Sequence, residues 1–141
     1  MGVVVDTSVL IASERGTFDF DGFVAAHDGD DIGMAAITAS EVLRGLTVTR
    51  AAAHDRRAQS AERMLDALQV APFGLAEARI HARLWAELAR QGKLIGPHDM
   101  LIAATALSLG SSVATLNSRE FRRVHGLKLE PIAKWARPKR G

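Results

Sequence analysis

The sequence predicts an α/β domain in which a central parallel β-sheet lies between layers of helices. Short apolar runs rich in β-branched residues alternate along the 141 residues with longer segments of helical periodicity. Of these residues, 48% are hydrophobic, which is enough for the single core of one domain. We therefore expect one domain over residues 1–135, followed by a basic C-terminal tail at 136–141.

The first half of the chain begins with GVVV, an uninterrupted apolar run that is typical of a strand buried on both faces. A second such run, IGMAAI, follows an acidic segment punctuated by glycine. The expected elements of this half are a strand at 2–5, helices at 9–14 and around 22–27, a strand at 32–37, a helix that opens at 38–41 and continues to Leu46, and a helix at 51–68.

In the second half, Ile80, Leu84 and Leu88 recur at four-residue steps and predict one helix. The run MLIAATALSL is apolar nearly all round, so it predicts a buried central helix that ends at Gly110. The expected elements are a strand at 70–73, helices at 75–91 and 100–109, a strand at 113–116, a short helix at 118–124 and an edge strand at 127–132.

Several kinds of protein are excluded by what the sequence lacks. It has no cysteine, which excludes disulfides, thiolate metal sites and cysteine nucleophiles, and which fits a reducing compartment such as the cytoplasm. No apolar run approaches the ~20 residues that span a bilayer, so we expect no membrane association. The sequence contains neither a phosphate-binding glycine loop nor a G-x-S-x-G motif, which leaves nucleotide hydrolysis and serine-hydrolase chemistry without support.

Charge is unevenly distributed along the chain. Residues 119–141 contain eight Lys or Arg against two Glu, whereas residues 1–41 contain eight acids and one base, Arg15. A basic end on an acidic body is suited to phosphate contacts, although the last few residues are equally typical of a solubilising tail.

Four acids follow expected strands, where helices begin: Asp6, Glu41, Asp99 and Glu120. In a parallel sheet such positions meet at the carboxyl edge, so their side chains are expected to converge on one crevice. Each acid also has a structural interpretation. Asp6 fits a helix cap, Thr38-x-x-Glu41 fits a capping box, Asp99 fits a helix dipole, and Glu120 fits ion pairs with neighbouring arginines.

Clustered carboxylates repel one another and need a counter-charge. Oxygen ligands without cysteine favour a hard divalent cation, Mg²⁺ or Mn²⁺, bound as one or two ions. Such a site suits phosphodiester hydrolysis, because the metal activates water and polarises the phosphate.

Four sequence motifs resemble those of PIN-domain ribonucleases, and most closely those of the VapC toxins of toxin–antitoxin pairs. They are VVVDTSVLIA, ITASEV with Arg44-Gly45, PHD with LIAATA, and ATLNSREF, which occur in the family's order over nearly the whole chain. The resemblance implies a PIN-like three-layer sandwich around a parallel sheet. It also implies Mg²⁺- or Mn²⁺-dependent endonucleolytic cleavage of RNA.

The resemblance also implies roles for individual residues. Asp6, Glu41 and Asp99 would be metal ligands, and Glu120 a fourth catalytic acid at a position where the family often has Asp. Ser8, Thr115 and Asn117 would support the site. The candidates for RNA contacts are Arg15, Arg44, Arg119, Arg122 and Arg123; for the last three, surface ion pairing with Glu120 is an equal alternative.

The partners implied by the resemblance are an RNA substrate, a VapB-type antitoxin and a second copy of the chain in a homodimer. Two other functions stay open at this stage. One is a catalytically silent PIN-like module that binds RNA or protein, and the other is a nuclease directed at DNA, because the same acids serve either polymer. A phosphoryl-accepting receiver domain is disfavoured, because the first strand is not followed by paired acids.

Overall fold

A computed structural model describes residues 2–47 and 51–138 of the chain. Three strands occur before the middle of the sequence and one after it. The strands are β1 (Val3–Val5), β2 (Ile32–Ala35), β3 (Gln69–Ala71) and β4 (Ser112–Ala114). The helices are α1 (Thr7–Glu14), α2 (Phe20–Ala26), α3 (Ala36–Thr47), α4 (Ala51–Ala67), α5 (Leu75–Arg90), α6 (Pro97–Leu109) and α7 (Ser118–Phe121), with a 3₁₀ turn, η1, at Ala133–Trp135.

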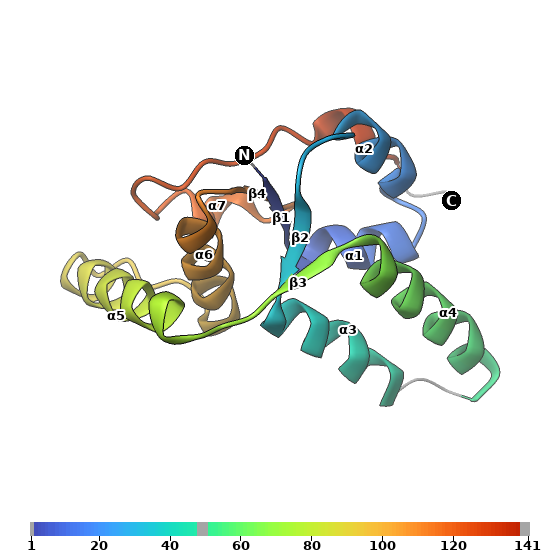
Figure 1. Cartoon of the computed structure of the whole chain (residues 1–141), viewed down its shortest axis with the longest axis horizontal. Helices are drawn as coiled ribbons and strands as arrows, with labels where there is room; N and C mark the ends of the chain where they lie inside the picture. Colours follow the sequence, from blue (N-terminus) through green and yellow to red (C-terminus); the bar gives the residue numbers. More distant parts are fainter. Residues whose placement is uncertain (1, 48–50, 139–141) are drawn as a thin grey trace.

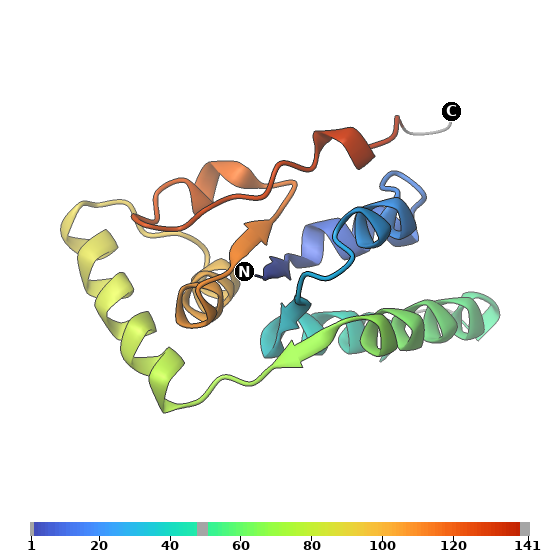
Figure 2. The ribbon, with the colours of Figure 1, turned by 45° about the horizontal axis from the view of Figure 1, so that its top comes forward.

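The four strands form one sheet in the order β3-β2-β1-β4, and all three pairings are parallel. The predicted α/β architecture is therefore confirmed. Figure 1 shows α5, α6 and α7 on one side of the strands and α1, α2 and α4 on the other, which gives three layers. Figure 2, turned by 45°, keeps the same separation.

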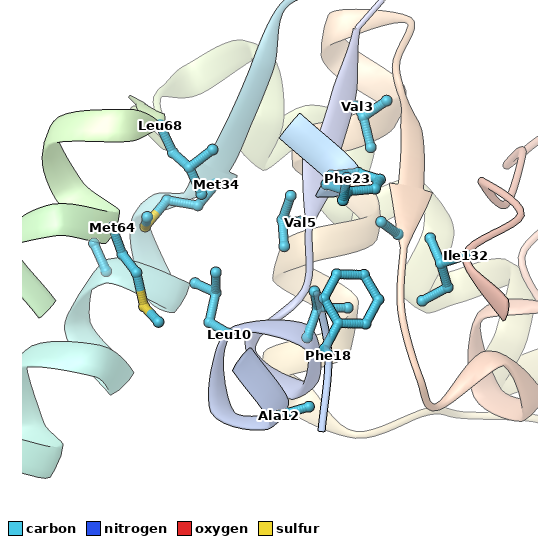
Figure 3. Packing of buried hydrophobic residues seen from close by; sticks show 13 residues of the cluster. Val3, Val5, Leu10, Ala12, Phe18, Phe23, Met34, Met64, Leu68 and Ile132 are labelled. Carbon is cyan, nitrogen blue, oxygen red and sulfur yellow. The ribbon is translucent and has the colours of Figure 1, made fainter. Parts of the chain in front are cut away.

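Alternation along β1 explains the two cores of the domain. Val3 and Val5 face one cluster, which includes Phe23 of α2 and Leu10 of α1 (Figure 3). Val4 faces the opposite cluster, which α5 and α6 cover. Because successive side chains of a strand point to opposite faces, an all-apolar strand is required where both faces are buried.

Helix α6 is the buried central helix that its apolar sequence predicts. Ile102, Ala103, Ala104 and Ala106 are each at most 1% exposed. Pro97 stands in the first turn, where its missing N–H is tolerated, and Gly110 ends the helix with a φ of 64° that favours glycine. The helix holds its first turn, which contains Asp99, rigidly against the sheet.

Two expected elements differ in the structure. Strand β2 ends at Ala35 and α3 begins at Ala36, so the helix does not open at 38–41. Thr38 and Glu41 consequently lie inside the helix, and the predicted capping box is wrong. Residues 127–132 form no strand, because only an isolated bridge joins Leu129 to Val113. Pro131 lacks the N–H that would continue such a ladder.

The segment after Leu129 contacts α2 and the residue that follows it, His27, near the amino end of the sheet. His27 is buried, with Nδ1 2.8 Å from the Phe23 carbonyl oxygen and Nε2 2.9 Å from Glu130 Oε1. Burial opposes the charged imidazolium, but these two hydrogen bonds and the Glu130 charge outweigh it, so the pKa of His27 is raised. Trp135 packs edge-on against Phe23 with ring centroids 5.4 Å apart.

The expected basic tail is partly docked on the domain. Arg137 pairs with Asp19 at 3.0 Å, and its backbone N–H donates to the Thr17 carbonyl. Residues 139–141 of the predicted tail lie outside the described residues. The extension of the domain to residue 135 stays a prediction. None of the helices in the described ranges combines the length and apolar character needed to cross a membrane.

Candidate active site

The carboxyl ends of β1, β2 and β4 bring the predicted acids to one edge of the sheet. Asp6 directly follows β1, Asp99 lies in the first turn of α6, and Glu41 lies on α3, which follows β2. A pocket of about 440 Å³ is lined by these three acids together with Thr7, Ser8, His98 and Asn117 among others. Three of the four predicted acids therefore share one crevice.

Asp6 is held by two hydroxyl groups. Ser8 Oγ and Thr115 Oγ1 each donate to Asp6 Oδ2 at 2.7 Å. The hydroxyls are themselves oriented, because Ser8 Oγ accepts from the Leu116 N–H and Thr115 Oγ1 accepts from the Asn117 N–H. The Asp6 side chain makes no helix-cap hydrogen bond, so the capping interpretation of this acid is wrong.

The arrangement around Asp6 leaves one oxygen for a ligand. Both hydroxyls approach Oδ2, and within the described residues no hydrogen bond reaches Oδ1. Asp6 as a whole is only 3% exposed. Ser8 and Thr115 thus lie beside Asp6, whereas Asn117 contributes its backbone N–H and makes no side-chain cap. Their supporting role stays a prediction.

Glu41 reaches the pocket from the second turn of α3. Its Oε1 accepts a hydrogen bond of 3.0 Å from Thr7 Oγ1, and its Oε2 lies 3.5 Å from His98 Nδ1. Thr7 directly follows Asp6 and His98 directly precedes Asp99. Thr7 and His98 therefore both contact Glu41, and these contacts link Glu41 to the backbone beside Asp6 and Asp99.

Asp99 and Glu120 form a hydrogen-bonded carboxyl pair. Burial, the hydrogen bond to Glu120, and the charges of Asp6, Glu120 and Glu41 together raise the pKa of Asp99 to about 7. The same hydrogen bond and the Gly96 N–H, 3.3 Å from Glu120 Oε2, lower the pKa of Glu120. The pair therefore keeps one proton up to near neutral pH.

Glu120 owes its position to the packing of α7. Phe121, the next residue, is fully buried and anchors this short helix on the core. Gly96, whose N–H binds Glu120, stands immediately before α6, so Glu120 touches the same helix start as Asp99. The fourth predicted acid therefore joins the cluster through Asp99.

The described residues supply the oxygen ligands that a divalent cation needs, but their side chains are not arranged as a complete binding site. No three Asp, Glu or His side chains among them lie close enough together to hold an ion directly. All donors are oxygens apart from His98, which suits a hard cation. Burial and the neighbouring carboxylates together raise the pKa of Asp99, and a bound cation would offset this excess of negative charge. The residues fit Mg²⁺ or Mn²⁺, provided that their side chains rotate into the pocket.

Among the arginines predicted to contact RNA, all of which lie in the described part of the chain, only Arg15 lines the pocket of the acids. Arg15 is exposed and lines the pocket, and Arg44 lies beside the neighbouring hollow between α1, α3 and α4. Arg119 on α7 and Arg122, which directly follows α7, are exposed. Arg123 donates to the Leu94 carbonyl at 3.0 Å, so at least part of its role is structural.

The largest hollow described, about 940 Å³ between α1, α2 and α4, contains none of the four predicted acids. Its acids Glu14 and Asp19 are paired with Arg57 and Arg137. Size therefore does not identify the active site here. The candidate site is the pocket of about 440 Å³, because Asp6, Glu41 and Asp99 line it.

Residues 3–127 match the family model described as the PIN domain. The chain belongs to the PIN-domain family. It is 36% identical over 136 residues to "Ribonuclease VapC1" of Rickettsia felis, with 94% of this chain and 98% of the relative covered. It is 34% identical over 97 residues to "tRNA(fMet)-specific endonuclease VapC" of Shigella flexneri, with 69% and 72% covered.

Within the PIN-domain family, the chain belongs to the VapC ribonucleases, the toxins of VapBC toxin–antitoxin modules. Its fold agrees with the DNA-bound VapBC structure from Salmonella typhimurium at a TM-score of 0.84 and 27% identity, covering 92% of this chain and 97% of that one. The resemblance seen in the four sequence motifs is therefore confirmed. Ribonuclease membership also favours RNA over DNA among the predicted substrates.

Proposed function

We propose that this VapC-type ribonuclease cleaves RNA endonucleolytically with Mg²⁺ or Mn²⁺ held at the crevice of Asp6, Glu41, Asp99 and Glu120. The observation that carries the proposal is that Asp6, Glu41 and Asp99, from three separate elements, line one pocket. The raised pKa of Asp99 agrees with it, because burial and neighbouring negative charges both favour the protonated carboxyl. Strongly perturbed acids in a cleft are typical of functional sites.

In the proposed site, Asp6, Glu41 and Asp99 hold one cation, and Glu120 acts through Asp99, through water or on a second ion. The chemistry that such an ion supplies when bound is polarisation of the phosphodiester and acidification of water. Ser8 and Thr115 hold Asp6 through Oδ2, which would leave Oδ1 to the cation. Without a cation, the Asp99–Glu120 pair holds one proton, and a bound cation would take the place of that proton.

We assign RNA backbone contacts to the arginines around the pocket. Arg15 is the best supported, since it is exposed and lines the same pocket as the acids. Further candidates lie on the elements that carry Glu41 and Glu120 or directly after them: Arg44, Arg119, Arg122 and Arg123. Guanidinium groups suit this role because they bind phosphates bidentately.

We also propose two protein partners. The solved relative from Salmonella typhimurium is a VapBC complex, which supports a VapB-type antitoxin for this chain. A homodimer is supported by exposed apolar side chains on and just before α5, where Leu75 is 69% and Trp85 53% exposed. Light scattering of the purified protein, alone and with its antitoxin, tests both. The cytoplasmic location expected from the sequence stays a prediction.

The catalytic proposal is tested by incubating antitoxin-free protein with total RNA, initiator tRNA and single-stranded DNA. Initiator tRNA is included because the Shigella flexneri relative is named for tRNA(fMet). We expect discrete RNA cuts with Mn²⁺ or Mg²⁺ and none with a chelator. Intact RNA with cleaved DNA indicates a DNA-directed nuclease. RNA that is bound but uncut at every metal concentration indicates a silent binding module.

A further inference from the structure

The Thr7 hydroxyl lies between two oxygen atoms from α3. Thr7 Oγ1 is 3.0 Å from Glu41 Oε1 and 3.2 Å from Thr38 Oγ1. Thr7 is 8% exposed and Thr38 fully buried, so little water competes for these contacts. A hydroxyl has one proton to donate. The carboxylate is the nearer acceptor and the charged one, and it therefore receives the stronger bond.

Glu41 depends on an orienting partner more than a shorter aspartate side chain does. Asp6 follows a strand directly and is held by two hydroxyls at 2.7 Å. Glu41 instead extends from inside α3 on a longer side chain, whose freedom must be restricted before its carboxylate acts at a fixed place. His98 Nδ1 faces its other oxygen at 3.5 Å, which is longer than a normal hydrogen bond.

We propose that Thr7 is a positioning residue whose hydroxyl fixes the Glu41 carboxylate toward the pocket of Asp6 and Asp99, and that it thereby sets the affinity of the site for Mg²⁺ and Mn²⁺. This inference rests on the proposed metal-dependent function and assigns that site a residue outside the four acids. Hydrogen bonds that orient metal ligands typically change metal affinity by about 10–100-fold.

The test compares two substitutions that each remove one hydroxyl from the same pair, Thr7→Val and Thr38→Val. Mn²⁺ binding is measured by isothermal titration calorimetry, and unfolding by urea, on the purified full chain. We expect Thr7→Val to weaken Mn²⁺ binding about 10–100-fold. Thr38→Val leaves the bond to Glu41 in place, so its Mn²⁺ affinity should stay within about threefold of wild type.

Thr7→Ser supplies the conservative rescue, because serine keeps the donor hydroxyl, and wild-type Mn²⁺ affinity should return. A second readout is the Mn²⁺ dependence of RNA cleavage. A positioning role predicts that Thr7→Val needs more Mn²⁺ for half-maximal cleavage, while most of the rate returns at saturation.

Equal weakening by Thr7→Val and Thr38→Val would mean that the hydroxyl pair serves packing alone, and the inference would be overturned. Unchanged Mn²⁺ affinity in Thr7→Val would overturn it too, with the metal site intact. Failure of the wild-type chain to bind Mn²⁺ is the distinct result that removes the proposed metal function together with this inference.

Discussion

The Asp99→Asn substitution is expected to stabilise the protein above neutral pH when no metal is present. The pKa of Asp99 is about 7 in the fold, against an ordinary value of 3.8. Between these values the native protein keeps a proton that the unfolded chain has released. The free energy of unfolding of the wild type therefore falls as the pH rises from about 4 to about 7.

The size of this effect follows from the pKa difference and the surroundings of Asp99. Each pKa unit corresponds to about 1.4 kcal/mol. The difference between the native and ordinary pKa of Asp99 would therefore lower the free energy of unfolding by about 4 kcal/mol if Asp99 were completely shielded from water. Asp99 is only partly buried, and the lowered pKa of Glu120 acts in the opposite sense, since its contribution is lost on acidification. Loss of a favourable carboxylate in the first turn of α6 reduces the gain further. We expect a net gain of about 1–2 kcal/mol at pH 8.

Urea unfolding in the presence of a chelator measures this gain at pH 5 and pH 8. At pH 5 only about a third of the fall between pH 4 and pH 7 has taken place, so the variant should gain about a third of what it gains at pH 8. Asp66→Asn, on the exposed face of α4, is the matched control and should respond equally at both pH values. A variant that gains nothing at pH 8, or that gains equally at pH 5, would refute the repulsion between carboxylates.

Three further substitutions test the supports of the fold and site by urea unfolding. Thr115→Val removes the 2.7 Å donor to the buried Asp6 and should cost about 1–3 kcal/mol; a neutral result would contradict the role of that hydroxyl. The His27–Glu130 pair stabilises the fold fully below the ordinary pKa of histidine, and this is lost as pH rises through the raised pKa. His27→Gln should therefore lose more stability at pH 6 than at pH 9, and a pH-independent loss would contradict a charged imidazolium. Phe23→Ala empties a fully buried position and should cost about 3–5 kcal/mol, whereas a loss below about 1 kcal/mol would show that the two-sided core is misassigned.

The fold was largely predictable because its strands are apolar on both faces. GVVV at the start of the chain specifies a central strand, and the all-apolar helix α6 specifies an element buried behind it. These two elements place Asp6 and Asp99 at the same edge, which parallel strands require. The order β3-β2-β1-β4 depended on tertiary pairing and was not predicted.

The start of α3 shows that a local sequence pattern can give the wrong first residue of a helix. Thr38-x-x-Glu41 satisfies the capping-box pattern, yet α3 begins two residues earlier. Tertiary packing decides the boundary, because β2 runs directly into the helix and Thr38 is fully buried. The prediction that Glu41 is a site acid came from its position after a strand, and the structure places Glu41 at the pocket although its capping pattern alone favoured a structural role.

Contacts between distant residues were beyond the sequence pattern. No role at the site was predicted for Thr7, although its hydroxyl reaches Glu41, 34 residues away. The His27–Glu130 contact joins residues 103 apart. No repeating sequence pattern signals either contact, because both depend on the order of the strands in the sheet. The residues that orient a site are therefore harder to predict than the acids that form it.

Single-turnover cleavage of RNA at saturating Mn²⁺, with Asp6→Asn and Asp99→Asn beside Asp66→Asn, tests the central claim most directly. All three substitutions remove one negative charge, but only the first two lie at the pocket. We expect both pocket variants to lose about 100-fold or more in rate, with native-like far-UV circular dichroism, and Asp66→Asn to match the wild type. Undiminished cleavage by Asp99→Asn would contradict an active site built on these carboxylates.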